Sequence, residues 1–318
     1  MCETCEHTIT VNSRINANTY DPTRTTVLRN TAVRESNRRF ESMIKEITKA
    51  VYTEDAFGLQ AYATPGKNAF AFPLDARKLQ AFMDWLQKLV AEHIIDIEDI
   101  PQVGSPMYGV WTNKYIVESY QRGMTRARQE MIRAGYAVPI ITALDLITPM
   151  QVPLHVESVG LMFMRTFNEL KGITDAMSQI ISRILAQGLI DGTNPRILAR
   201  KLVAAINGKG VGELGITDTL GRFIPAKRRA EIMARTEIIR AHHYASINEY
   251  KRWGIIGVNI KAEFKTAGDD TVCAICASME GNMYTLEEAL PIIPVHPQCR
   301  CIMLPISVDD KGVRETYE

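Results

Sequence analysis

Apolar residues recur at helical spacing over most of the chain. This periodicity is typical of amphipathic helices that bury one face. Two of the predicted helices begin with a capping residue followed by proline, at Asp21-Pro22 and Asn194-Pro195, and proline suits the first helical position. The pattern predicts helices over about 21–51, 75–90, 112–135, 154–171, 174–189, 195–206 and 225–253, the last being the longest in its half of the chain.

The periodicity changes from helical to alternating after residue 257. Val258, Ile260, Ala262 and Phe264 alternate with polar neighbours, which predicts a strand. The following segment is expected to form a tight turn at Gly281-Asn282, a return strand at Met283-Tyr284, a small helix at 286–290 and a last strand at 302–304. The predicted fold class is therefore α+β: mainly helical, with a small C-terminal subdomain that contains β-structure.

Composition along the chain suggests its domain organisation. Residues 1–20 are polar and without clear periodicity, so a mobile arm is expected there. Residues 136–153 are apolar and bounded by prolines, which places a boundary between a helical domain at 21–150 and a second domain at 151–318. The glycine-rich stretch 207–221 lacks the P-loop pattern, so a loop or hairpin is expected.

Overall composition excludes several classes of protein. The 318 residues are 46% hydrophobic and 23% charged, with a net charge of +1, so no global attraction to nucleic acid or to anionic membranes is expected. No apolar run approaches the roughly 20 residues needed to cross a bilayer. The N-terminus also lacks the features of a signal peptide. Folding in a cytosol with reduced thiols is therefore expected.

Four of the six cysteines fall within the last fifty residues, in Cys273-Ala-Ile-Cys276 and His296-Pro-Gln-Cys299-Arg-Cys301. Thiolate and imidazole are ligands that Zn²⁺ prefers, and four of them close a structural site. Cys273, Cys276 and Cys299 are completed by either His296 or Cys301, and both alternatives stay open. Such a zinc site would staple the subdomain, because metal-binding energy becomes folding energy. Buried unligated thiols and disulfides are the other interpretations.

A catalytic zinc would need an open coordination position and a nearby base. Asp269, Asp270 and Glu280 are close in sequence, but neither the deaminase pattern nor H-E-x-x-H is present. A closed, structural site is therefore favoured. Cys2-x-x-Cys5-x-His7 offers three further ligands at most, on the arm, and is expected to stay unligated.

Basic residues gather around the start of the predicted helix at 225–253. Cations near a helix N-terminus oppose the helix dipole, which suggests a partner for them, either DNA phosphates or an acidic protein surface. The candidates for DNA contact are Arg222, Lys227, Arg228, Arg229 and Arg240. His242 and His243 are adjacent on this helix and point about 100° apart, so they are expected to be surface or packing residues rather than ligands of one ion.

These motifs together resemble a known family. The order Ala234-Arg235-Thr236-Glu237, Asp270-x-x-Cys273-x-x-Cys276, Gly281 and His296-Pro297-x-Cys299-Arg300-Cys301 is similar to the C-terminal domain of phage Mu F-like minor head proteins, also called the phage head morphogenesis family. The resemblance is specific over about 230–305. The helical stretch from about 154, with Gly192-x-Asn194-Pro195-Arg196, also fits it.

The resemblance implies a non-enzymatic component of the virion. Such a protein is made in the host cytoplasm, lies inside the capsid with the portal, and acts in head assembly and in DNA packaging or ejection. The implied partners are the portal or major capsid protein and packaged DNA, with no membrane and no small-molecule substrate. The alternatives are a zinc-dependent nuclease or other hydrolase, and a stand-alone zinc-stapled DNA-binding module.

Overall fold

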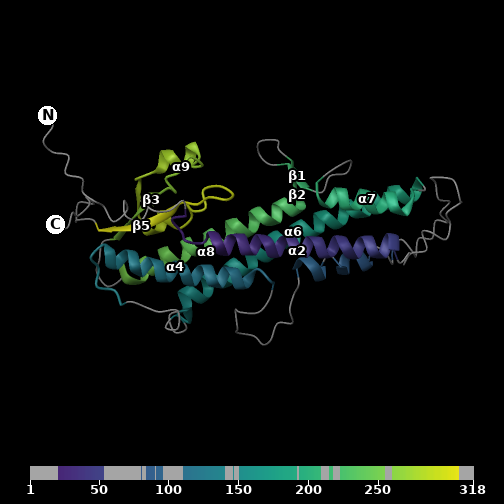
Figure 1. The fold of residues 1–318 in the computed structure, drawn as a ribbon. Coiled ribbons are helices and arrows are strands. Elements are labelled where there is room, and N and C mark those ends of the chain that lie inside the picture. Colours follow the sequence, from purple (N-terminus) through teal and green to yellow (C-terminus); the bar gives the residue numbers. More distant parts are fainter. Residues whose placement is uncertain are drawn as a thin grey trace. The chain divides into compact units, whose positions relative to one another are not determined.

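The computed structural model is mainly helical, with a small antiparallel sheet near the C-terminus, as the sequence predicts (Figure 1). The candidate residues Cys2, Cys5, His7 and Arg222 lie outside the described part of the chain, as does the predicted arm at 1–20. The residues that the structure describes are 21–53, 80, 84–89, 91–95, 110–139, 146, 150–191, 193–208, 215–217, 223–254 and 260–307.

Contacts divide the chain into two compact units. The first unit comprises Met1–Asn30, Asn113–Phe163 and Arg235–Glu318, and the second comprises Thr31–Thr112 and Met164–Ala234. Each unit draws residues from both sides of residue 150. The division into domains at 21–150 and 151–318 stays a prediction, because compactness and independent folding are different properties.

The second unit is built from helices and one short hairpin. Strands β1 and β2 pair antiparallel, which places a hairpin within the glycine-rich region where a loop or hairpin was predicted. Asn194 caps α7 as predicted, its side-chain oxygen accepting a hydrogen bond from Arg196 N at 2.9 Å. Its α-helices are most of α2 (Thr26–Thr48), most of α6 (Pro153–Ile190), α7 (Pro195–Ile206) and the start of α8 (Ala226–Gly254). It also contains two short π-helices, η1 (Lys49–Thr53) and η2 (Ala91–Ile95), and the strands β1 (Gly215–Thr217) and β2 (Phe223–Pro225).

Two details of the predicted helices are wrong. Helix α6 is continuous over 38 residues, where two helices at 154–171 and 174–189 were expected, so α6 rather than α8 is the longest. Gly172 lies inside it, but the buried stripe of Leu170, Ile173 and Met177 continues past this glycine. Burial of that stripe outweighs the roughly 1 kcal/mol that a glycine costs within a helix.

The first helix also begins later than predicted. Asp21 and Pro22 lie in a turn before α2 rather than at its N-cap and first helical position, although the Asp21 side chain accepts a hydrogen bond from Thr26 N at 2.8 Å. Arg24, in the same turn, has a φ of 54°.

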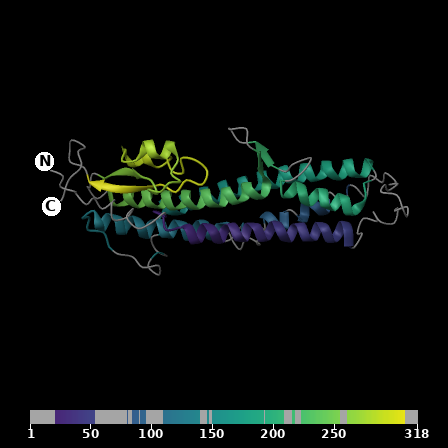
Figure 2. The same ribbon diagram turned by 45° about the horizontal axis from the view of Figure 1, so that its top comes forward.

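The first unit contains the sheet, which has the strand order β4-β3-β5. Ala262 of β3 pairs with Tyr284 on one side and with Pro305 on the other. Figure 2 shows the sheet lying along the C-terminal half of α8, where Tyr250 donates a hydrogen bond to Met303 O at 3.3 Å. The elements of the unit are α4 (Asn113–Arg133), the ends of α6 and α8, β3 (Ile260–Lys265), α9 (Ala274–Met279), β4 (Met283–Tyr284), α10 (Leu286–Ala289) and β5 (Ile302–Ser307).

A close contact between α4 and α8 depends on small residues. A methyl group at Gly123 would overlap the carbonyl oxygen of His242 and lie 2.8 Å from Ala245 Cβ. Because a backbone atom cannot move aside as a side chain can, the helices could accept that methyl only by separating.

Gly123→Ala is therefore expected to destabilise the protein by about 1–3 kcal/mol, although alanine favours helix more than glycine does. Urea unfolding followed by circular dichroism would measure the change. The control is Gly160→Ala in α6, where an added Cβ meets no atom within 4 Å, and this change should be neutral or stabilising. Equal effects of the two substitutions would contradict the proposed helix contact.

A buried polar network links α4, α6 and α8 within the first unit. Glu249, fully buried, lies 2.9 Å from Arg128 Nε and 3.2 Å from His155 Nε2. Tyr120 OH donates to His155 Nδ1 at 2.8 Å, and burial raises the pKa of Tyr120 to about 12. Burial alone would raise the pKa of Glu249, but hydrogen bonds from His155 and Arg128 outweigh it and lower that pKa. Glu249 is therefore held as a carboxylate.

Candidate metal centre

The first pair of candidate ligands is positioned by the start of α9. Cys273 is the N-cap of this helix, and its Sγ accepts a hydrogen bond from Cys276 N at 3.4 Å. Because Cys276 follows within the first turn, both sulfurs lie on the same side of the helix start. Cys276 is almost fully buried, whereas Cys273 is partly exposed.

His296 approaches this pair from the loop that precedes β5. Its Nε2 lies 3.3 Å from Cys273 Sγ and 3.3 Å from Cys276 Sγ. Its Nδ1 is 2.8 Å from Pro297 O, a carbonyl that can only accept, so the ring proton belongs on Nδ1. The Nε2 lone pair then faces the two sulfurs, and a second hydrogen bond of this kind is usual for histidines that bind metal.

Cys299 and Cys301 complete the cluster. Their sulfurs form a second group with Cys276 in which all three lie within 4.8 Å of one another. Cys273, Cys276 and His296 form the first such group, so Cys276 belongs to both. The structure thus brings together all five residues that the sequence singled out. Whether His296 or Cys301 completes a tetrad stays open.

The four clustered cysteines are free thiols, not disulfides. A hydrogen bond from Cys301, acting against burial, lowers the pKa of Cys299 to about 5. Burial, followed by repulsion from Cys299, raises the pKa of Cys276 to about 12. One thiolate is thus stabilised at the expense of its neighbours, and a bound cation would stabilise several at once. Sulfur and imidazole donors at these separations fit Zn²⁺, which would supply a rigid cross-link here.

Two hydrogen bonds attach the region of the Cys/His cluster to α8. Gln298 N donates to Thr236 Oγ1 at 3.1 Å, and His243 Nε2 donates to Ala289 O at 2.9 Å. Burial lowers the pKa of His243 to about 4, so this ring is a neutral donor near pH 7. His242 and His243 are both buried, so they are packing residues. Packing was one of the two roles that the sequence predicted, and surface exposure was the other. The sequence analysis missed the role of Thr236, although it belongs to the recognised Ala234–Glu237 motif.

Two of the three nearby carboxylates have structural partners. Asp269 accepts two hydrogen bonds from Arg300, each 2.6 Å long, and this pairing holds its pKa well below the usual range. Glu280 accepts from Thr266 N at 2.6 Å and lies 2.9 Å from Lys265 Nζ. Asp270 is exposed. Asp269 and Glu280 thus hold the loops on either side of α9.

The candidate residues for DNA contact also have carboxylate partners where they are described. Arg228 lies 2.6 Å from Glu231, and Arg240 lies 3.2 Å from Glu237. Lys227 is 3.4 Å from Glu41, and Arg229 is 3.4 Å from Glu169. These pairs neutralise much of the local positive charge, so DNA contact through these residues stays a prediction.

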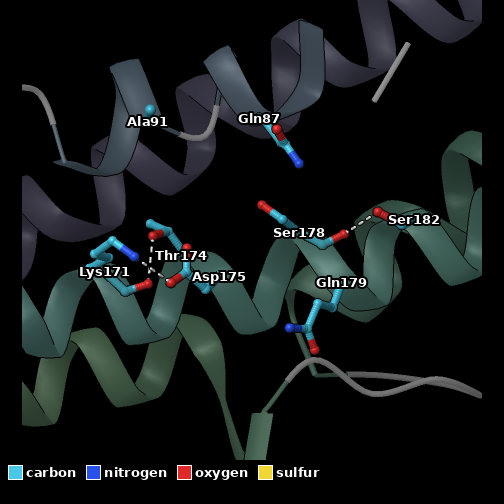
Figure 3. A pocket seen from close by; sticks show the side chains of 8 residues that line it. All are labelled: Gln87, Ala91, Lys171, Thr174, Asp175, Ser178, Gln179 and Ser182. Atoms are coloured by element: carbon cyan, nitrogen blue, oxygen red, sulfur yellow. Dashed lines mark hydrogen bonds and ion pairs between the residues drawn. The ribbon is translucent and has the colours of Figure 1, made fainter. Parts of the chain in front are cut away.

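A polar cavity of about 440 Å³ lies in the second unit, between residues 87–91 and α6 (Figure 3). Its two charged residues, Lys171 and Asp175, pair with each other at 3.0 Å. The cavity therefore offers no net charge to a ligand. Among the described helices, none is both long and apolar enough to cross a membrane.

Comparison with known proteins finds a family that is similar to the part of the chain with the Cys/His cluster. Residues 179–304 match the family model described as "Phage Mu protein F like protein". No curated protein and no solved structure gives a significant match to the chain. The matched segment runs from within α6 to β5 and includes all five candidate ligands. Over this segment, the chain is similar to the phage Mu protein F-like family.

Proposed function

We propose that the protein is a minor head protein of a tailed bacteriophage that acts in head morphogenesis. The family match over 179–304 is the observation that carries this proposal. In the proposed role the protein is made in the host cytoplasm, enters the capsid with the portal, and assists DNA packaging or ejection. Its part is structural rather than catalytic, and Asp269 and Glu280 fit that role because each holds a loop in place.

In this proposal a structural zinc ion fixes the C-terminal subdomain. The sheet has only three short strands, of six, two and six residues, so a cross-link would add appreciably to the stability of the subdomain. Cys273, Cys276 and Cys299, with His296 or Cys301, would bind the ion and join α9 to the loop before β5. The subdomain would then present a rigid surface to the portal or the major capsid protein.

Location in the phage particle tests the proposed function. Heads purified from an infected culture on a density gradient should contain the protein, and it should resist protease until the heads are opened. A pull-down with the portal protein should retain it. Recovery of the protein in the soluble fraction alone, with none in the heads, would contradict the proposal.

A further inference from the structure

A second cavity, of about 410 Å³, lies within the first unit and is distinct from the metal cluster. The turn before α2, one face of α4 and Leu146 enclose it. Three arginines line it: Arg24 from the turn, and Arg122 and Arg126 from α4. We call it the arginine cavity. Arg122 and Arg126 were not singled out as site residues from the sequence.

Arg126 is the buried member of this group. Its side chain is only 7% exposed, and its Nε lies 3.1 Å from Glu130. Neither of its Nη atoms has a hydrogen-bond acceptor among the described residues. Burial lowers its pKa, and the charges of Arg24 and Arg133 add to that effect. Burying a cation without acceptors is costly, and an anion in the cavity would offset that cost.

The charges around the cavity do not balance. Its lining contains a single carboxylate, Glu118, and Arg122 pairs with it at 2.5 Å. Behind the lining, Glu130 is shared between Arg126 and Arg133, at 3.1 and 2.9 Å. The lining thus carries three arginines and one carboxylate, and Arg133 and Glu130 behind it add one charge of each sign. Arg24 has no ion pair with any described residue.

The backbone brings the arginines together from distant parts of the sequence. The turn is closed by a hydrogen bond from Arg24 N to Asp21 O at 3.1 Å. Arg122 Nη1 donates to Arg24 O at 3.3 Å, which joins the turn to α4. The amide side chains of Gln121 and Gln129, which also line the cavity, add uncharged donors.

We propose that the arginine cavity binds a phosphate group. The planar guanidinium fork of arginine matches the oxygens of phosphate. Arg24 and Arg122 line the cavity beside amide donors, and the buried charge of Arg126 adds to the positive potential there. The phosphate could be free inorganic phosphate or a phosphodiester of DNA, since both present the same oxygens. The DNA source rests on the proposed function, whereas phosphate binding itself does not.

The test compares two double variants of the full-length protein. Arg24→Gln with Arg122→Gln removes two cavity charges and leaves the buried Arg126 in place. The control, Arg34→Gln with Arg38→Gln, removes the same charge from two exposed residues of α2. Equal melting temperatures in phosphate-free buffer would show that both variants fold.

Calorimetric titration with inorganic phosphate should show binding to the wild type and to the control. The dissociation constant of the cavity variant should rise at least about tenfold. Anisotropy of a labelled DNA duplex, measured across a range of salt, tests the phosphodiester. Loss of this one phosphate contact should reduce the slope of log K against log salt by about 1.

Phosphate binding without DNA binding would identify free phosphate as the source and support the site. The proposal is overturned if the wild type binds neither probe, or if the cavity variant binds both as well as the control does. Absence of the protein from phage heads would contradict the proposed function alone and would leave phosphate binding intact.

Discussion

Cys276→Ser is expected to abolish metal binding and to unfold the C-terminal subdomain. Cys276 belongs to both groups of potential ligands, so each of the two candidate tetrads loses a sulfur. Structural zinc sites supply binding free energy on the order of 10 kcal/mol, which is folding free energy in small domains. A serine hydroxyl is a poor substitute for a thiolate ligand.

Metal analysis of the purified, reduced protein would measure the loss directly. Amide hydrogen exchange over β3, α9 and β5 would show whether the subdomain opens, and a chelator should reproduce that exchange in the wild type. The matched control is Cys5→Ser, at a cysteine expected to be unligated, which should leave zinc content unchanged. Wild-type protein without zinc, or Cys276→Ser protein that retains it, would contradict the metal site.

The same measurement decides the fourth ligand. His296→Ala and Cys301→Ser each remove one of the two alternatives. The substitution that removes a true ligand should weaken zinc binding strongly, and the other should have a much smaller effect. The hydrogen bond from His296 Nδ1 to Pro297 O favours His296, because it directs Nε2 at Cys273 and Cys276.

Glu249→Ala is expected to destabilise the first unit by about 3–5 kcal/mol, the usual cost of removing one partner from a buried ion pair. Glu249 is fully buried and contacts Arg128, His155 and Trp253, the last through a hydrogen bond of 3.0 Å from Nε1. Its removal leaves the Arg128 guanidinium, whose side chain is 4% exposed, without its carboxylate.

Urea unfolding followed by circular dichroism would measure this change. The control is Glu287→Ala, because Glu287 is 76% exposed and its 3.5 Å pair with Lys251 should contribute less than about 1 kcal/mol. Adding Arg128→Met to Glu249→Leu should restore stability relative to Glu249→Leu alone, since no buried charge is then left uncompensated. A loss below about 1 kcal/mol for Glu249→Ala would contradict the role of the network.

The candidate metal residues could be predicted because they are close in sequence. Cys273 and Cys276 share one helical turn, and His296, Cys299 and Cys301 share one short loop. Strand β3 precedes the first group in the sequence and β5 follows the second. The two strands hydrogen-bond to each other, which brings the two groups together. The fastening of this segment through Thr236 and His243 could not be predicted, because it depends on how the loop packs against α8.

Helix prediction succeeded where neighbouring residues decide the structure and failed where tertiary packing overrides them. Asn194 capped α7 as expected because a cap depends on residues two or three positions away. The break predicted near Gly172 did not occur, because burial of the stripe on either side outweighs the local preference of glycine. Local propensity is a weak guide where tertiary packing opposes it.

The sequence by itself determined the helical character, the C-terminal sheet, the five candidate ligands and the resemblance to the phage Mu protein F-like family over residues 179–304. Each of these depends on periodicity or on spacing between near neighbours. Only the tertiary structure decided that Cys276 is common to both ligand groups, that Glu249 is a buried carboxylate, and that Arg24 meets Arg122 and Arg126 around a cavity. These features join residues from different elements, and side-chain packing rather than sequence spacing sets the distances between them.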